Sequence, residues 1–148
     1  MDQTTKKQTE EGLAELYRNV QLAITSIADI MPNLENDELL KDTLMHQYEI
    51  YEQFSARAQI LARDLEIELK EPNPMKKAMM WSSIKMSTLT DNSRSHIAEM
   101  MAQGTVMGIT ALLRTQRELK GGDERIFKLF EELIKQEEAF EKKWKDLV

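Results

Sequence analysis

Apolar residues recur every three or four positions along nearly the whole chain, and this periodicity limits the fold more than any other feature. The pattern is clearest over residues 9–30, 36–70, 75–119 and 123–147. A repeat near 3.6 residues is that of an α-helix with one apolar side. The sequence therefore predicts an all-α protein in which four amphipathic helices pack around a shared core.

Prolines and glycines predict where these helices end. Pro32 should end the first helix, because the residue before a proline is pushed out of the helical region. The run 71–74, Glu-Pro-Asn-Pro, should end the second helix, and Gly121 and Gly122 the third. Such short loops favour an antiparallel up-down-up-down four-helix bundle that forms one domain over residues 1–148.

The third predicted helix is long, and residues 88–93 are poor helix formers in which Asp91 could cap a new start. We favour a continuous or kinked helix over a clean break at this point. A second helix that runs to residue 70 needs a long antiparallel partner beyond a short turn.

Composition excludes several classes of function. The chain has 148 residues, a formal net charge of −6 and no cysteine. Disulfides, thiolate zinc sites and cysteine nucleophiles are therefore excluded. Nucleic acid is not an expected partner, because phosphate binding needs a basic patch. The longest uncharged stretch, residues 100–113, is too short and too polar to span a bilayer, and without an apolar signal core the cytoplasm is the expected compartment.

The two histidines each open a His-x-x-Glu pattern, formed by His46 with Glu49 and by His96 with Glu99. A helix brings residues i and i+3 onto one side. If the second and third helices are antiparallel neighbours, His46 lies level with Glu99 and Glu49 with His96. Neutral imidazole and carboxylate groups can ligate iron, manganese or zinc. The alternative is two solvated or interface ion pairs, because His46 and Glu49 lie away from the apolar side of their helix.

Glu137 is unusual because it falls within the apolar side of the fourth helix. A carboxylate in that position must find a hydrogen-bond partner or a metal ion, or it must become neutral. Glu137 is therefore added to the candidate metal ligands. The alternative is that it lies at the edge of the apolar side and extends outward to water.

The third predicted helix is rich in methionine, and flexible thioethers suit adaptable binding surfaces as well as irregular cores. Gly104 and Gly108 lie one turn apart in it, which favours the close approach of a neighbouring backbone. A two-fold homodimer is one explanation, and a contact within the chain is the other. The candidate interface residues are Met100, Met101, Gly104, Met107 and Gly108.

Residues 81–109, and above all the segment His-Ile-Ala-Glu-Met-Met-Ala-Gln-Gly-Thr-Val-Met-Gly-Ile at 96–109, resemble an uncharacterised family of small all-helical bacterial proteins. The resemblance covers about residues 47–109 and implies the ferritin-like four-helix class. It implies no activity. Di-metal members of the ferritin-like class use Glu-x-x-His on two helices. Here the order is reversed twice, which argues against a standard di-metal centre.

The function predicted from the sequence is a non-enzymatic binding or structural role, carried by the methionine-rich third helix toward a second copy or another protein. No catalytic residue and no cofactor are predicted, because nothing resembles a nucleophile with its base or a phosphate-binding loop. The alternative is a ferritin-like protein that binds iron, manganese or zinc through His46, Glu49, His96 and Glu99, with help from Glu137.

Overall fold

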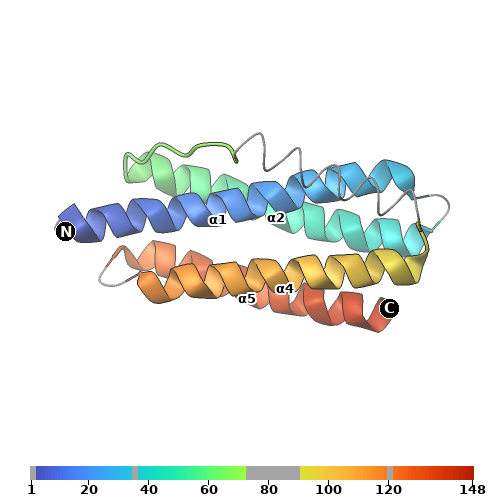
Figure 1. Cartoon of the computed structure of the whole chain (residues 1–148). Coiled ribbons are helices and arrows are strands. Elements are labelled where there is room, and N and C mark those ends of the chain that lie inside the picture. Colours follow the sequence, from blue (N-terminus) through green and yellow to red (C-terminus); the bar gives the residue numbers. More distant parts are fainter. Residues whose placement is uncertain (1–2, 35–36, 73–90, 120–121) are drawn as a thin grey trace.

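The computed structural model describes residues 3–34, 37–72, 91–119 and 122–148. Within these ranges the chain forms four α-helices and one short 3-10 helix, and it forms no strand. The all-α prediction is confirmed. The elements are α1 Gln3–Ile30, η1 Met31–Asn33, α2 Glu38–Asp64, α4 Arg94–Glu118 and α5 Glu124–Leu147 (Figure 1).

The first and last helices agree with the sequence at three of their four ends. α1 begins at Gln3 rather than at residue 9, and it ends at Ile30, where Pro32 lies in the 3-10 turn. α5 begins after Asp123, whose carboxylate accepts a hydrogen bond from the Arg125 backbone N–H at 2.8 Å. Such an acceptor satisfies one of the unpaired N–H groups of a helix start.

α2 ends at Asp64, so the predicted extension to residue 70 is wrong. Glu66 adopts a left-handed conformation with φ of 56°. This turn lets the Ile67 N–H bond to the Ala62 carbonyl at 2.8 Å and the Glu66 N–H bond to the Arg63 carbonyl at 3.2 Å. That pairing is the Schellman motif, which usually carries glycine at the left-handed position. Because glutamate occupies it here, the sequence gives no glycine to mark the end.

The prediction of a continuous or kinked third helix over residues 75–119 is also wrong. α4 begins at Arg94, and the described residues before it, 91–93, are not helical. Ser93 is the cap, since its hydroxyl accepts the His96 N–H at 3.3 Å. Asp91, the predicted cap, instead accepts the Ser93 N–H at 2.9 Å. The predicted helix over residues 75–90, with four of its methionines, lies outside the described residues.

The helix directions differ from the predicted up-down-up-down order. Asp37, the cap of α2, forms an ion pair with Arg94, the first residue of α4, at 2.8 Å. The two helices therefore start at the same end of the bundle and run in the same direction (Figure 1). At the opposite end of the bundle, Oδ2 of Asp64 in α2 lies 3.7 Å from Nη1 of Arg125 in α5. The order is up-down-down-up, and the end of α2 and the start of α4 lie at opposite ends of the bundle.

The helices pack with α1 against α2 and α4, and with α5 against α4 and α2, so that α2 and α4 lie diagonally. Each helix turns its apolar side inward. Large, fully buried side chains come from all four helices and include Leu13, Leu16, Ile27, Leu44, Tyr51, Ile97, Leu112, Phe130 and Trp144. No helix of the described part of the chain is long and apolar enough to cross a membrane.

Candidate functional site

The structure does not bring the two His-x-x-Glu patterns together. His46 is exposed and lies edge-on to the Phe140 ring, at 5.9 Å between ring centroids, and Glu49 is exposed as well. His96 is half-buried near the start of α4, and Glu99 is exposed. In the described ranges, no three His, Cys, Asp or Glu residues are grouped so that they could hold a metal ion.

The predicted alignment of these patterns is wrong because it assumed antiparallel neighbours. α2 and α4 run in the same direction from a common level at Asp37 and Arg94. His46 comes nine residues after Asp37, and His96 only two residues after Arg94. At 1.5 Å per residue, the two histidines are therefore offset by roughly 10 Å along the bundle. They also lie on helices at opposite corners of the bundle.

Glu137, by contrast, is buried, with 1% of its surface exposed. The Tyr51 hydroxyl donates a hydrogen bond to Glu137 Oε1. The Gln47 side-chain amide donates to the Tyr51 hydroxyl oxygen at 2.6 Å. The Trp144 indole N–H donates to the Gln47 side-chain carbonyl at 2.6 Å. These hydrogen bonds form one continuous chain that links α2 and α5 in the interior.

The antiparallel packing of α2 against α5 explains why these residues meet. Gln47 and Tyr51 lie one turn apart on α2, and Glu137 and Trp144 lie two turns apart on α5, so each pair shares one side of its helix. Thr105 of α4 adds a hydroxyl 3.5 Å from the Gln47 amide nitrogen. We call these five buried residues the buried polar cluster.

The second carboxylate oxygen of Glu137 explains one of the two glycines of α4. A Cβ atom at Gly108 would lie 2.9 Å from Glu137 Oε2, so any larger residue would press on the carboxylate. The Gly108 carbonyl accepts a hydrogen bond from the Asn19 side chain of α1 at 3.2 Å. Gly108 therefore serves a contact within the chain. Gly104 differs, because a Cβ there would meet nothing within 4 Å.

Burial sets the protonation of the cluster. It raises the pKa of Glu137 to about 7, while the hydrogen bond from Tyr51 acts in the opposite direction. Burial and the Glu137 carboxylate also raise the pKa of Tyr51 well above its usual value. The cluster can therefore hold or release one proton near neutral pH.

Two surface pockets, one between α4 and α5 and one between α1 and α4, are lined by none of the residues of the buried polar cluster.

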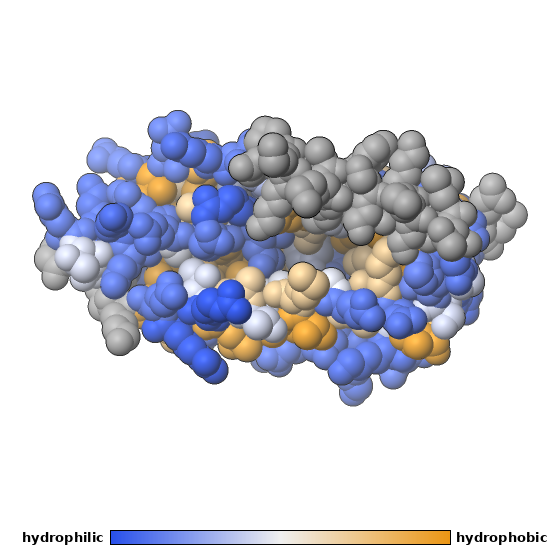
Figure 2. All heavy atoms as spheres, viewed as in Figure 1, coloured by the Kyte–Doolittle hydropathy of each residue, from blue (hydrophilic) through white to orange (hydrophobic). Residues whose placement is uncertain are grey.

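The predicted interface residues divide between the core and the surface. Met101 is buried, and Met100 and Gly108 are half-buried. Gly104 and Met107 point outward, and Met107 is 73% exposed, the largest value among the large apolar side chains of the described residues. These two residues belong to an exposed strip that we call the outer face of α4, which consists of Gln103, Gly104, Val106, Met107, Thr110, Ala111 and Leu113. Figure 2 shows apolar residues in the middle of this side of the molecule, with hydrophilic residues to the left and right of them.

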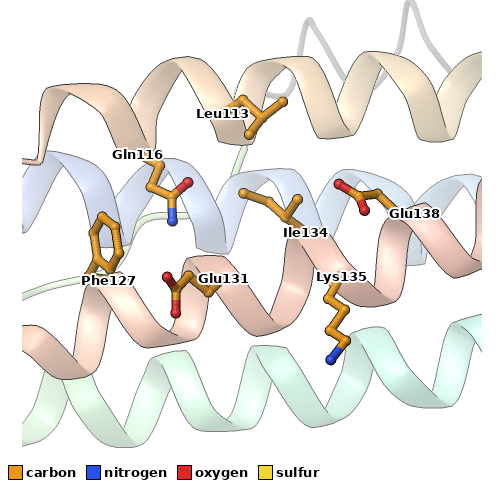
Figure 3. Close-up of a pocket in the computed structure, with 7 residues that line it drawn as sticks. All are labelled: Leu113, Gln116, Phe127, Glu131, Ile134, Lys135 and Glu138. Atoms are coloured by element: carbon orange, nitrogen blue, oxygen red, sulfur yellow. The ribbon is translucent and has the colours of Figure 1, made fainter.

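The outer face of α4 continues into an open groove between α4 and α5. Leu113 belongs to both, and Phe127 and Ile134 of α5 line the groove opposite it (Figure 3). Phe127 is 43% exposed. Glu131 and Glu138 stand at the margin of these apolar side chains. An apolar strip with a polar margin is typical of protein contact surfaces.

No protein-family model, curated protein or solved structure matches this chain. Sequence reasoning recognised Glu137 as out of place but did not single out Gln47, Tyr51 and Trp144, which lie on the buried sides of their helices. Their pairing could have been found by asking which polar residues of the second helix lie level with Glu137 once that helix is antiparallel to the fourth.

Proposed function

We propose that this protein is a non-enzymatic helical binding protein that docks a protein partner on the outer face of α4. The observation that supports this proposal most is the solvent exposure of three apolar side chains on α4. Met107 is 73% exposed, Val106 is 39% exposed and Leu113 is 36% exposed. Three exposed apolar side chains within two turns of one helix lose water contact when a partner covers them, which favours association. The thioether of Met107 adapts its shape to the surface it meets.

The buried polar cluster supports a structural role for the interior. Within it, the Tyr51 hydroxyl, the Gln47 amide and the Trp144 indole N–H each donate to another member. Side chains whose hydrogen-bonding groups satisfy one another stabilise a single arrangement of the core. The docking surface would then be a rigid helix face held by the core behind it.

We also propose that the fold belongs to the ferritin-like four-helix class. Ferritin-like bundles have one long crossover connection between the second and third helices of the bundle. The ion pair of Asp37 with Arg94 and the close approach of Asp64 to Arg125 support this order, because they place the end of α2 and the start of α4 at opposite ends of the bundle.

Our second proposal is that the protein binds iron, manganese or zinc. The observation that supports it is Glu137, a carboxylate buried in the interior of the bundle. The residues around it do not fit a di-metal centre. The cluster holds one carboxylate, and the Trp144 indole N–H can only donate. His46, Glu49, His96 and Glu99 would have to bind separately, as pairs on single helices. Thermal shifts on metal loading of untagged protein, compared with H96A and H46A, test this proposal.

The binding proposal is tested by photo-crosslinking in the cells that naturally make the protein. A photoreactive amino acid replaces Met107 in one variant and Ile60 in the control, since Ile60 is 57% exposed on α2. We expect position 107 to give discrete protein adducts that position 60 does not give. If both positions give the same adducts, or neither gives any, the proposal is wrong.

A further inference from the structure

We propose that the partner on the outer face of α4 is a second copy of this chain, whose α4 packs antiparallel to the first across a two-fold axis near residues 106 and 107. This inference rests on the proposed function and names its partner.

Two charged residues of α4 are placed so that they complement each other between two copies of the helix. Glu99 and Arg114 are both exposed, and neither forms a salt bridge within the described residues. In an antiparallel pair of identical helices, two residues face each other when they lie equally far from the axis in opposite directions. Glu99 and Arg114 are equidistant from the midpoint between Val106 and Met107. Each Glu99 would then face Arg114 of the other copy, and the pair would occur twice.

The residues between these charges fit the same register. The midpoint lies beside Met107, the most exposed of the large apolar side chains in the described ranges. Gln103 and Thr110 are also equidistant from it, and both are exposed polar residues that can hydrogen-bond across the axis. Met107 of the other copy lies level with Val106, two residues or roughly 3 Å along the axis from Gly104, which is within reach of its flexible side chain. Because the space where its Cβ would stand is open, Gly104 leaves a notch into which that thioether can pack.

This arrangement explains why Gly104 is tolerated on an exposed helix surface. Glycine in a helix interior costs roughly 1 kcal/mol relative to alanine. Gly108 is explained by Glu137 and Asn19, but nothing within its own chain approaches the missing Cβ of Gly104. A second helix that approaches closely at this point would supply the missing contact.

Charge reversal tests the register. The variants E99R and R114E each place like charges opposite one another twice in a homodimer, so each should weaken self-association by about tenfold. An equimolar mixture of the two variants restores both attractive pairs, and so does the double variant. We expect sedimentation equilibrium at low salt to show dimers for wild type, the mixture and the double variant, and weaker association for either single variant alone.

Two results would overturn the inference. One is a wild-type protein that stays monomeric at micromolar concentrations, and the other is a wild-type dimer that neither single reversal weakens. Both are distinct from failure of the proposed function. If position 107 gives crosslinks in cells only to a different protein, the self-association is wrong, and the docking role of the outer face of α4 stands.

Discussion

The Tyr51 hydroxyl donates its hydrogen bond to the Glu137 carboxylate in the interior of the bundle, between α2 and α5. Burying the ionised carboxylate of Glu137 here costs more free energy than burying a neutral group would. A buried carboxylate without a cationic partner is stabilised mainly by the hydrogen bonds that it accepts. Burial outweighs that stabilisation here, since the pKa of Glu137 rises from 4.5 to about 7. The pair therefore connects the stability of the fold to pH.

The free energy of unfolding should fall as the pH rises from 4.5 to about 7 because of Glu137. In this window the folded protein keeps the Glu137 proton, and the unfolded chain has released it. Unfolding then releases a proton, so the contribution falls by about 1.4 kcal/mol per pH unit and by roughly 3 kcal/mol in all. Above about pH 7, Glu137 is ionised in both the folded and the unfolded protein, so its effect on the free energy of unfolding no longer changes with pH. Urea unfolding at several pH values between these limits measures the slope.

The matched control for this prediction is Glu137→Gln. The amide keeps an acceptor for the Tyr51 hydroxyl but cannot ionise, so the variant should lose this slope and exceed wild type in stability at alkaline pH. A variant that keeps the wild-type slope, or is less stable than wild type at alkaline pH, would show that Glu137 is not the responsible group.

The two glycines of α4 should respond oppositely to alanine. Gly104→Ala adds a methyl group in open space, and the gain in helix propensity should raise the free energy of unfolding by up to about 1 kcal/mol. The methyl group that Gly108→Ala adds would press against the carboxylate of Glu137, which Tyr51 holds in place. This variant should lower the free energy of unfolding by about 1–3 kcal/mol. Denaturant unfolding of both variants, below the concentration at which the chain associates, checks the signs. Equal effects would contradict the assignment of Gly108 to the core.

The up-down-down-up order can be tested by crosslinking, because the chain has no cysteine of its own. Cysteines that replace Asp37 and Arg94 should be joined by a short bis-maleimide, since the two native side chains are in contact at one end of the bundle. Cysteines that replace Asp64 and Arg94 are the control and should stay unlinked, because α2, with 27 residues, separates them by roughly 40 Å. The opposite pattern would restore the up-down-up-down order.

The sequence predicted the helices better than their connections. The apolar periodicity identified every described helix, because each buries one side against the others. The periodicity did not predict the helix ends that local hydrogen bonds determine. The end of α2 depends on a left-handed Glu66 rather than on a glycine, and the start of α4 depends on Ser93 within a polar run. These two errors caused the error in topology, because a second helix that reached residue 70 would have needed only a short turn.

The candidate sites were predictable to a similar degree. Glu137 was identified because a carboxylate interrupts an apolar side, and it is buried as that position implies. The pairing of His46 with His96 was not predictable, because level positions on two helices depend on their relative direction. Gly104 and Gly108 look alike in sequence, and only the position of Glu137 in space separates them.

The central claim, that the outer face of α4 is covered by a partner, is tested most directly by the oxidation rate of Met107. Oxidation of a thioether to the sulfoxide follows its exposure. Met107 is 73% exposed, and Met45 on α2, at 41%, is an internal control. In dilute purified protein, mild peroxide should oxidise Met107 faster than Met45, as peptide mass spectrometry measures. In intact cells that make the protein, we expect Met107 to become the slower of the two. If Met107 remains the faster in cells, the outer face of α4 is uncovered there, and the proposed docking role is wrong.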